Sequence, residues 1–116
     1  MKTILVVDDE PDIRKTVAAL LRNQGFVVKT AVNGDDCIKK LQNMTPDLII
    51  LDIMMPGTPV KDIVKKVKNI KTIFLTVVRM ADAEKEELMG QGNVVDFIQK
   101  PFEINELVKR IKMHAT

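Results

Sequence analysis

The segment Thr3-Ile-Leu-Val-Val-Asp-Asp-Glu-Pro11 is the clearest indication of how this chain folds. It opens with a short, partly β-branched apolar run, which is typical of a strand covered on both faces. The run stops at three acidic residues, and Pro11 then suits the first turn of a helix. An apolar stripe at helical spacing follows, and Gly25 stands where that helix would end. The segment therefore predicts one strand followed by one helix.

The same alternation of strand and helix continues along the chain. We expect further strands at 26–28, 48–51, 73–75 and 94–98, further helices near 35–43, 60–69 and 83–89, and a last helix on the stripe Ile104, Leu107, Val108 and Ile111. Consecutive parallel strands need long right-handed crossovers, which are usually helical and cover both faces of the sheet. The pattern therefore predicts the α/β class, a doubly wound five-stranded parallel sheet with five helices on both faces.

The composition fits one soluble globular domain spanning residues 1–116. The hydrophobic fraction is 46% and the charged fraction 29%, close to the averages for such proteins. Apolar runs stay far below the roughly 20 residues that a membrane-spanning helix needs, and the first residues do not resemble a signal peptide. We therefore expect a cytoplasmic protein that does not bind membranes. The single cysteine, Cys37, is expected to be a small buried apolar residue.

The charge pattern argues against direct binding of nucleic acid. The net charge is only +2, and the lysines are spread along the chain. We interpret the densest group as a solvated face on and just after a helix, comprising Lys61, Lys65, Lys66, Lys68 and Lys71. The chain has no Trp or Tyr, so a stacking platform for single-stranded bases is not expected. His114, near the end of the last helix, is interpreted as a solvated residue.

Polar residues stand at the predicted carboxyl ends of four strands. Asp8 and Asp9 follow the first strand, Asp52 follows the third, Thr76 ends the fourth, and Lys100 follows the fifth. In an open parallel sheet these ends meet at one edge, where ligands bind. Two carboxylates about 4 Å apart repel by roughly 4 kcal/mol at an effective dielectric near 20, so a cation is needed among them.

Magnesium suits this set better than zinc, because the candidate ligands are oxygens and the pattern brings no His or Cys to them. A carboxylate held beside a divalent ion and a lysine can attack phosphorus to give an aspartyl phosphate. The hydroxyl of Thr76 could then donate to a phosphoryl oxygen, which would convert occupancy of the site into a loop displacement.

Four motifs in this order resemble the receiver domains of two-component response regulators, over essentially the whole chain. The motifs are Ile4-Leu-Val-Val-Asp-Asp-Glu-Pro11, Asp52-Ile-Met-Met-Pro-Gly57, Thr76 and Lys100-Pro101-Phe102. The resemblance implies a flavodoxin-like sheet with strand order 2-1-3-4-5, a cis proline after the lysine, and no output domain within 1–116. It also implies a sensor histidine kinase or phosphotransfer protein as phosphoryl donor, and a downstream protein target or a separate output domain.

The resemblance implies a role for each site residue. Asp52 is expected to be the phosphoacceptor, with Lys100 closing the site. The expected ligands of Mg²⁺, or of Mn²⁺ as a substitute, are Asp9 directly, Asp8 through water, Asp52, and the backbone carbonyl of Met54.

Two further residues are expected to report the state of the site: Thr76 as the switch hydroxyl and Phe97 as the switch aromatic. Partners would read the face built from the fourth helix, fifth strand and fifth helix. The chain would not be an enzyme beyond transfer of phosphate to itself and its slow loss. Met54 and Val78 are apolar at positions that flank the hydrolytic water in the family, which predicts a long-lived phosphorylated state.

Three other functions compete with this interpretation. A receiver-like module could bind proteins without phosphorylation, but the set Asp8, Asp9, Asp52, Thr76 and Lys100 argues against it. A flavin carrier of similar architecture would need a hydroxyl-rich phosphate loop after the first strand, where this chain is acidic. A phosphatase with an aspartyl nucleophile would need a second acid two residues after Asp52, where Met54 stands.

Overall fold

The computed structural model describes residues 2–52, 60–76, 86, 90 and 92–115 of the chain. The described strands and helices follow one another in the predicted order: β1 (Thr3–Val7), α1 (Pro11–Asn23), β2 (Val27–Ala31), α2 (Gly34–Leu41), β3 (Leu48–Asp52), α3 (Val60–Lys66), β4 (Lys71–Thr76), β5 (Val94–Gln99) and α5 (Ile104–Ala115). The helix expected near 83–89 lies almost wholly outside the described residues. Four of the five expected helices are therefore present in the described part of the chain.

The five strands form one parallel sheet in the order β2-β1-β3-β4-β5, which confirms the expected order. The chain moves outward from β1 to β2 and then returns past β1 to add β3, β4 and β5 on the other side. The direction of winding thus reverses between β1 and β3. Open α/β sheets bind ligands beside the carboxyl ends of the strands at such a reversal.

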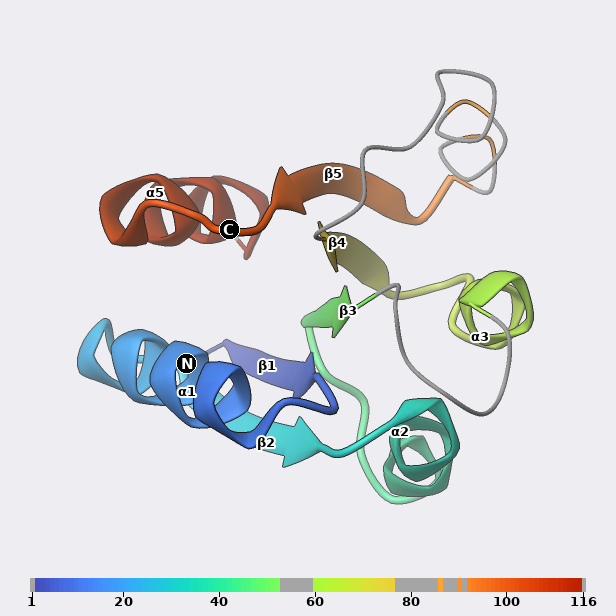
Figure 1. The fold of residues 1–116 in the computed structure, drawn as a ribbon. Helices are drawn as coiled ribbons and strands as arrows, with labels where there is room; N and C mark the ends of the chain where they lie inside the picture. The colour runs from blue at the N-terminus through green and yellow to red at the C-terminus, as the bar shows by residue number, and fades with distance from the viewer. Residues whose placement is uncertain (1, 53–59, 77–85, 87–89, 91, 116) are drawn as a thin grey trace.

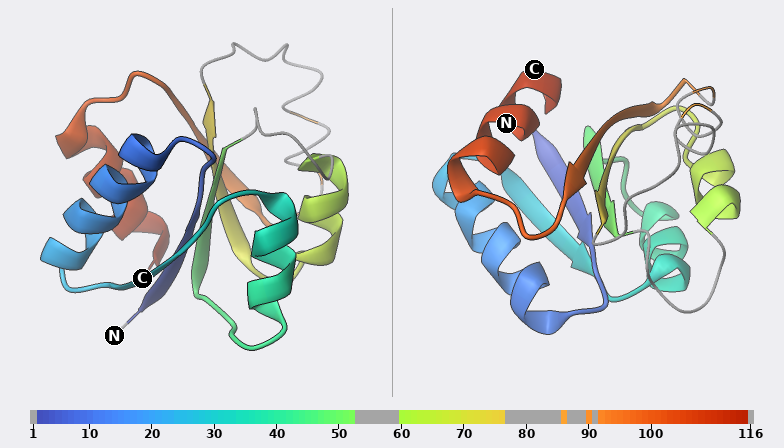
Figure 2. Two further views of the ribbon diagram at one scale, coloured as in Figure 1. Left: turned by 60° about the horizontal axis from the view of Figure 1, so that its bottom comes forward. Right: turned by 45° about the horizontal axis from the view of Figure 1, so that its top comes forward.

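Helices cover both faces of the sheet (Figure 1). Helices α1 and α5 lie on one face, and α2 and α3 lie on the other; Figure 2 shows the two layers from further directions. Alternate strand residues enter the two cores: Ile4 and Val6 pack with residues of α1 and α5, whereas Leu5 and Val7 pack with residues of α2 and α3. This double burial explains why β1 and β3 are apolar without alternation.

Packing against β1 sets the bounds of β2. The strand spans Val27–Ala31 rather than 26–28, because every residue of β1 has a partner in it, from Thr3 with Val27 to Val7 with Ala31. The polar residues Lys29 and Thr30 hide this extent in the sequence. Because β2 is an edge strand, polar side chains are tolerated there.

Helix ends differ from the expected ones by a few residues. Helix α3 ends at Lys66 rather than near residue 69, because the chain turns where the amide of Ile70 donates to the carbonyl of Val67 at 2.8 Å. Helix α1 begins at Pro11 as predicted, and Gly25 ends it in the left-handed region with φ of 93°. The described helices are all too short or too polar to cross a membrane.

Candidate functional site

The ends of β1 and β3 bring two acids together. These strands are neighbours, and Val7 is in register with Leu51, so the next residues, Asp8 just after β1 and Asp52 at the end of β3, lie side by side. Both residues are almost completely buried, with exposed fractions of 0% and 2%. Because a buried carboxylate is costly without a partner, positively charged or donor groups must face this pair.

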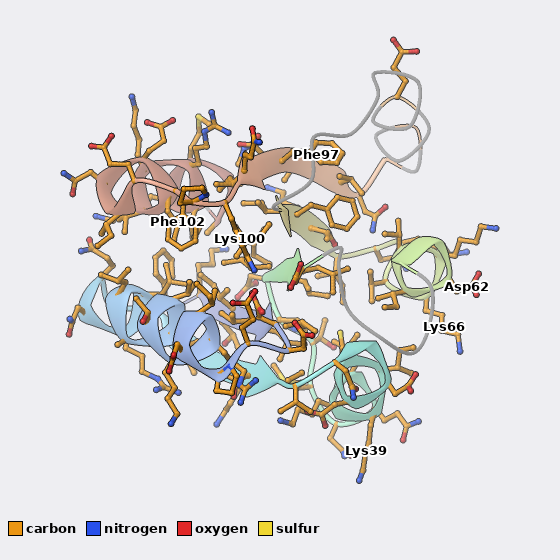
Figure 3. All side chains as sticks on the ribbon, viewed as in Figure 1. Lys39, Asp62, Lys66, Phe97, Lys100 and Phe102 are labelled. Atoms are coloured by element: carbon orange, nitrogen blue, oxygen red, sulfur yellow. The ribbon has the colours of Figure 1, made fainter. Side chains whose placement is uncertain are left out.

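Lys100 supplies the positive charge. Its ammonium nitrogen lies 2.8 Å from Asp8 and 3.4 Å from Asp52, and 3.6 Å from Glu10. Figure 3 shows this side chain pointing from the end of β5 toward the ends of β1 and β3. The lysine is only 6% exposed, and the peptide bond to Pro101 is cis, as expected.

The carboxylates keep this buried lysine charged. Burial alone lowers the pKa of Lys100, but its hydrogen bond to Asp8 and the charges of Asp52, Asp8 and Glu10 outweigh burial and hold the pKa above its ordinary value. The side chain is therefore a permanent cation at neutral pH. It can bind a phosphoryl oxygen without first taking up a proton.

Four acids form a cluster around this lysine. One carboxylate oxygen from each of Asp8, Asp9, Glu10 and Asp52 lies within 4.8 Å of the others. Asp8 and Asp52 are buried, whereas Asp9 and Glu10 are exposed and make the cluster reachable from solvent. Hard oxygen donors in this number suit Mg²⁺ or Mn²⁺, and the cluster contains no His or Cys that would favour zinc. The donor set therefore fits the expected metal.

Glu10 was not predicted as part of the site. It joins the cluster through the turn after β1, where the amide of Glu10 donates to a carboxylate oxygen of Asp8 at 2.9 Å. The one feature of the sequence that could have indicated this role is the position of Glu10 directly after Asp8 and Asp9. Glu10 is also the N-cap residue of α1.

The remaining predicted residues are described to different extents. Phe97 is half-buried, pairs in register with Phe74, and packs on it with ring centroids 5.3 Å apart. Thr76 is the last residue of β4, next to β5, and only its backbone is described. Met54, Val78 and the loop after Asp52 lie outside the described residues.

A second polar cluster joins β5 to α5. Asp96 lies 3.3 Å from Arg110 and 3.1 Å from the Nε2 atom of His114, and Arg110 also donates to the backbone carbonyl of Phe97 at 3.0 Å. The prediction that His114 is merely solvated was therefore wrong. The contact depends on how α5 sits on β5, and the residues are 18 positions apart in the sequence.

Comparison with known proteins identifies one family. Residues 4–112 match the response regulator receiver domain. The chain is 34% identical to transcriptional regulatory protein ResD of Bacillus subtilis over 110 residues, which are 94% of this chain and 46% of ResD. It is 32% identical to the probable transcriptional regulatory protein TcrX of Mycobacterium tuberculosis, over 95% of this chain and 48% of TcrX. The chain thus spans about half the length of these curated relatives.

Solved structures agree with this result. Response regulator protein TrrA of Thermotoga maritima, in complex with Mg(2+)-BeF, is 36% identical and superposes with a TM-score of 0.78 over 97% of this chain and 98% of TrrA. Chemotaxis protein CheY4 of Vibrio cholerae is 29% identical, with a TM-score of 0.86 over 98% of both chains. The chain belongs to the family of response regulator receiver domains of two-component systems.

Proposed function

We propose that this domain is a phosphorylation-dependent switch that accepts a phosphoryl group on Asp52. The proposed donor is a phosphohistidine of a sensor histidine kinase or phosphotransfer protein. The observation that carries the proposal is the position of Asp52, a buried carboxylate 3.4 Å from the ammonium of Lys100 and within 4.8 Å of three further acids. A carboxylate in such surroundings can act as a nucleophile toward phosphorus.

Each residue would do one part of the transfer. An oxygen of Asp52 forms a bond to phosphorus while the phosphorus–nitrogen bond of the donor breaks, and the electron pair of that bond stays on the imidazole nitrogen. Lys100 holds a phosphoryl oxygen and offsets its charge. Asp8 orients Lys100 through the 2.8 Å hydrogen bond. Because both ends of that bond are buried, the ammonium is held in place before the donor arrives.

The acid cluster would hold Mg²⁺, with Mn²⁺ as a substitute. Asp9 and Asp52 are the proposed direct ligands together with the backbone carbonyl of Met54, and Asp8, already engaged with Lys100, would act through water. A bound magnesium ion would neutralise charge on the phosphoryl oxygens and orient them. Asp9, which is exposed, leaves the centre open toward solvent and thus toward a donor protein.

The signal would leave the site through β4 and β5. Thr76 is the proposed hydroxyl donor to the phosphoryl group, and it is in register with Gln99, next to Lys100 on the neighbouring strand. Phe97 is the proposed aromatic reporter, because it lies near the carboxyl end of β5 and its ring packs on Phe74 of the neighbouring strand. The face that includes β5 and α5 would then bind a downstream protein or an output domain.

Beryllofluoride tests this function, because with Mg²⁺ it mimics a phosphoryl group on a carboxylate. The chain has no Trp or Tyr, so amide chemical shifts in ¹H–¹⁵N NMR spectra are a better readout than fluorescence. We expect magnesium-dependent shifts around Asp52, Thr76 and Phe97 in the parent chain and none in Asp52→Asn. A parent spectrum that does not respond would instead favour a receiver-like module that binds proteins without phosphorylation.

A further inference from the structure

We propose that Arg14 is a positioning residue of the acidic centre and that it raises the affinity of the centre for a divalent cation. Its guanidinium nitrogen Nη1 donates to the backbone carbonyl of Asp8 at 2.8 Å. It would act by fixing the peptide group between Asp8 and Asp9, and not by touching the cation. The inference rests on the proposed function, since it concerns the same magnesium site.

The connection from β1 to α1 carries three of the four clustered acids, so its shape decides whether they meet. Its first amide, at Asp8, donates to Ala31 and extends the pairing of β1 with β2. The next contact is local, from the amide of Glu10 to the Asp8 carboxylate. Arg14, the fourth residue of α1, adds a side-chain contact to the carbonyl of Asp8 and so ties the connection to the helix.

The place of Arg14 is otherwise unfavourable. It stands near the amino-terminal end of α1, where the helix dipole disfavours a positive charge. The hydrogen bond to the carbonyl of Asp8, strengthened by the charge of its donor, offsets part of that cost. A cation at this position has two opposite effects on a metal site: its charge repels the metal, whereas its hydrogen bond orders the ligands.

These two effects predict opposite changes in the affinity for Mg²⁺ when Arg14 is replaced. Magnesium chloride is titrated into the full chain by isothermal titration calorimetry, for the parent and for Arg14→Met. If charge dominates, loss of the guanidinium tightens binding of Mg²⁺. If positioning dominates, the dissociation constant rises, by roughly tenfold as for other residues that orient metal ligands. We expect the rise.

Two companion variants separate positioning from charge and from general stability. Lys15→Met removes an exposed cation from the next position of the same helix, and we expect its affinity for Mg²⁺ to equal or slightly exceed that of the parent. Arg14→Lys keeps the charge but shortens the side chain and loses the fork of donors. Weaker binding in Arg14→Lys therefore cannot come from charge, and this variant carries the test if Arg14→Met does not fold.

A double-mutant cycle tests whether Arg14 acts through the position of Asp9. If Arg14 acts by placing the carboxylate of Asp9, replacing Arg14 in an Asp9→Asn background changes the affinity less than it does in the parent. Tighter or unchanged binding of Mg²⁺ in folded Arg14→Met or Arg14→Lys would overturn the inference and leave the proposed function intact. A parent chain that bound no Mg²⁺ would overturn the proposed function itself, and the inference with it.

Discussion

The ammonium of Lys100 lies 2.8 Å from a carboxylate oxygen of Asp8, although the two residues are 92 positions apart in the sequence. The bond joins the connection after β1 to the end of β5, across β3 and β4. It places a buried cation among the acids at the reversal of the sheet. The stability of the domain and the chemistry proposed for it therefore depend on the same contact.

Loss of Lys100 should destabilise the domain. Lys100→Met leaves Asp8 and Asp52 buried without the ammonium, so we expect the free energy of unfolding to fall by about 3 kcal/mol. Added Mg²⁺ should restore part of the loss, because it returns positive charge to the same acids. Urea unfolding with and without Mg²⁺ measures both effects. Lys66→Met, at an exposed lysine of α3 that points away from the sheet, is the control (Figure 3); equal losses in the two variants would contradict the prediction.

Loss of Asp96 should loosen α5. Asp96→Ala removes the acceptor shared by Arg110 and His114, and since these side chains are partly exposed we expect a loss of about 1 kcal/mol. The urea midpoint of the domain measures it. Asp62→Ala, on the outer face of α3, controls for loss of an exposed carboxylate. An Asp96→Ala midpoint no lower than that of the control would mean that the cluster adds no stability.

The acid limb of the stability curve should depend on Asp36. The backbone amide of Val32 donates to the carboxylate of Asp36, and this bond is the main reason why the pKa of Asp36 lies below its ordinary 3.8. Burial raises the pKa, and Lys40 lowers it. A lowered folded-state pKa stabilises the protein above pH 3.8, and that contribution is lost as the pH falls through the folded-state value. Asp36→Asn should therefore be less stable than the parent at pH 7, by about 0.5 kcal/mol, and equal to it at low pH.

Asp12→Asn is the matched control, because Asp12 is an exposed acid in the first turn of α1 and interacts with its helix dipole as Asp36 does in the first turn of α2. The free energy of unfolding is measured from pH 7 down to pH 2. A gap between Asp36→Asn and the parent that persisted at pH 2 would show that the effect is not electrostatic.

Cys37 should resist thiol reagents in the folded protein. Burial, with a smaller contribution from the charge of Asp36, raises the pKa of this thiol to about 11, and the side chain is 0% exposed. At pH 8 the thiolate is then roughly a hundredfold rarer than for an ordinary cysteine, and it is also inaccessible. Labelling with a disulfide reagent should follow unfolding in urea. Rapid labelling in native buffer would contradict this.

Local patterns predicted most of the fold. The apolar runs of β1 and β3 are buried on both faces, so they stand out in the sequence, and the acids that end them mark the strand ends. The extent of β2 was not predictable, because only pairing with β1 keeps Lys29 and Thr30 in a strand. Strand propensity is low for Lys29 and favourable for Thr30, so propensity alone does not decide and pairing with β1 does.

The site was predictable where strand ends dictate it and not where side chains from distant elements meet. Asp52 ends β3 and Lys100 directly follows β5, so the topology brings them to one edge. Glu10 enters through a turn whose hydrogen bond cannot be read from residue types. The contact of His114 with Asp96 needs the rotation of α5 about its own axis, which the core residues Leu107 and Ile111 set.

The intact mass of the chain after incubation with acetyl phosphate and Mg²⁺ shows directly whether Asp52 accepts a phosphoryl group. We predict that the parent gains the mass of one phosphoryl group, that Asp52→Asn gains none, and that chelation of the metal prevents the gain. Equal labelling of the parent and Asp52→Asn, or no labelling of the folded parent in the presence of Mg²⁺, would contradict the assignment of Asp52 as the phosphoacceptor.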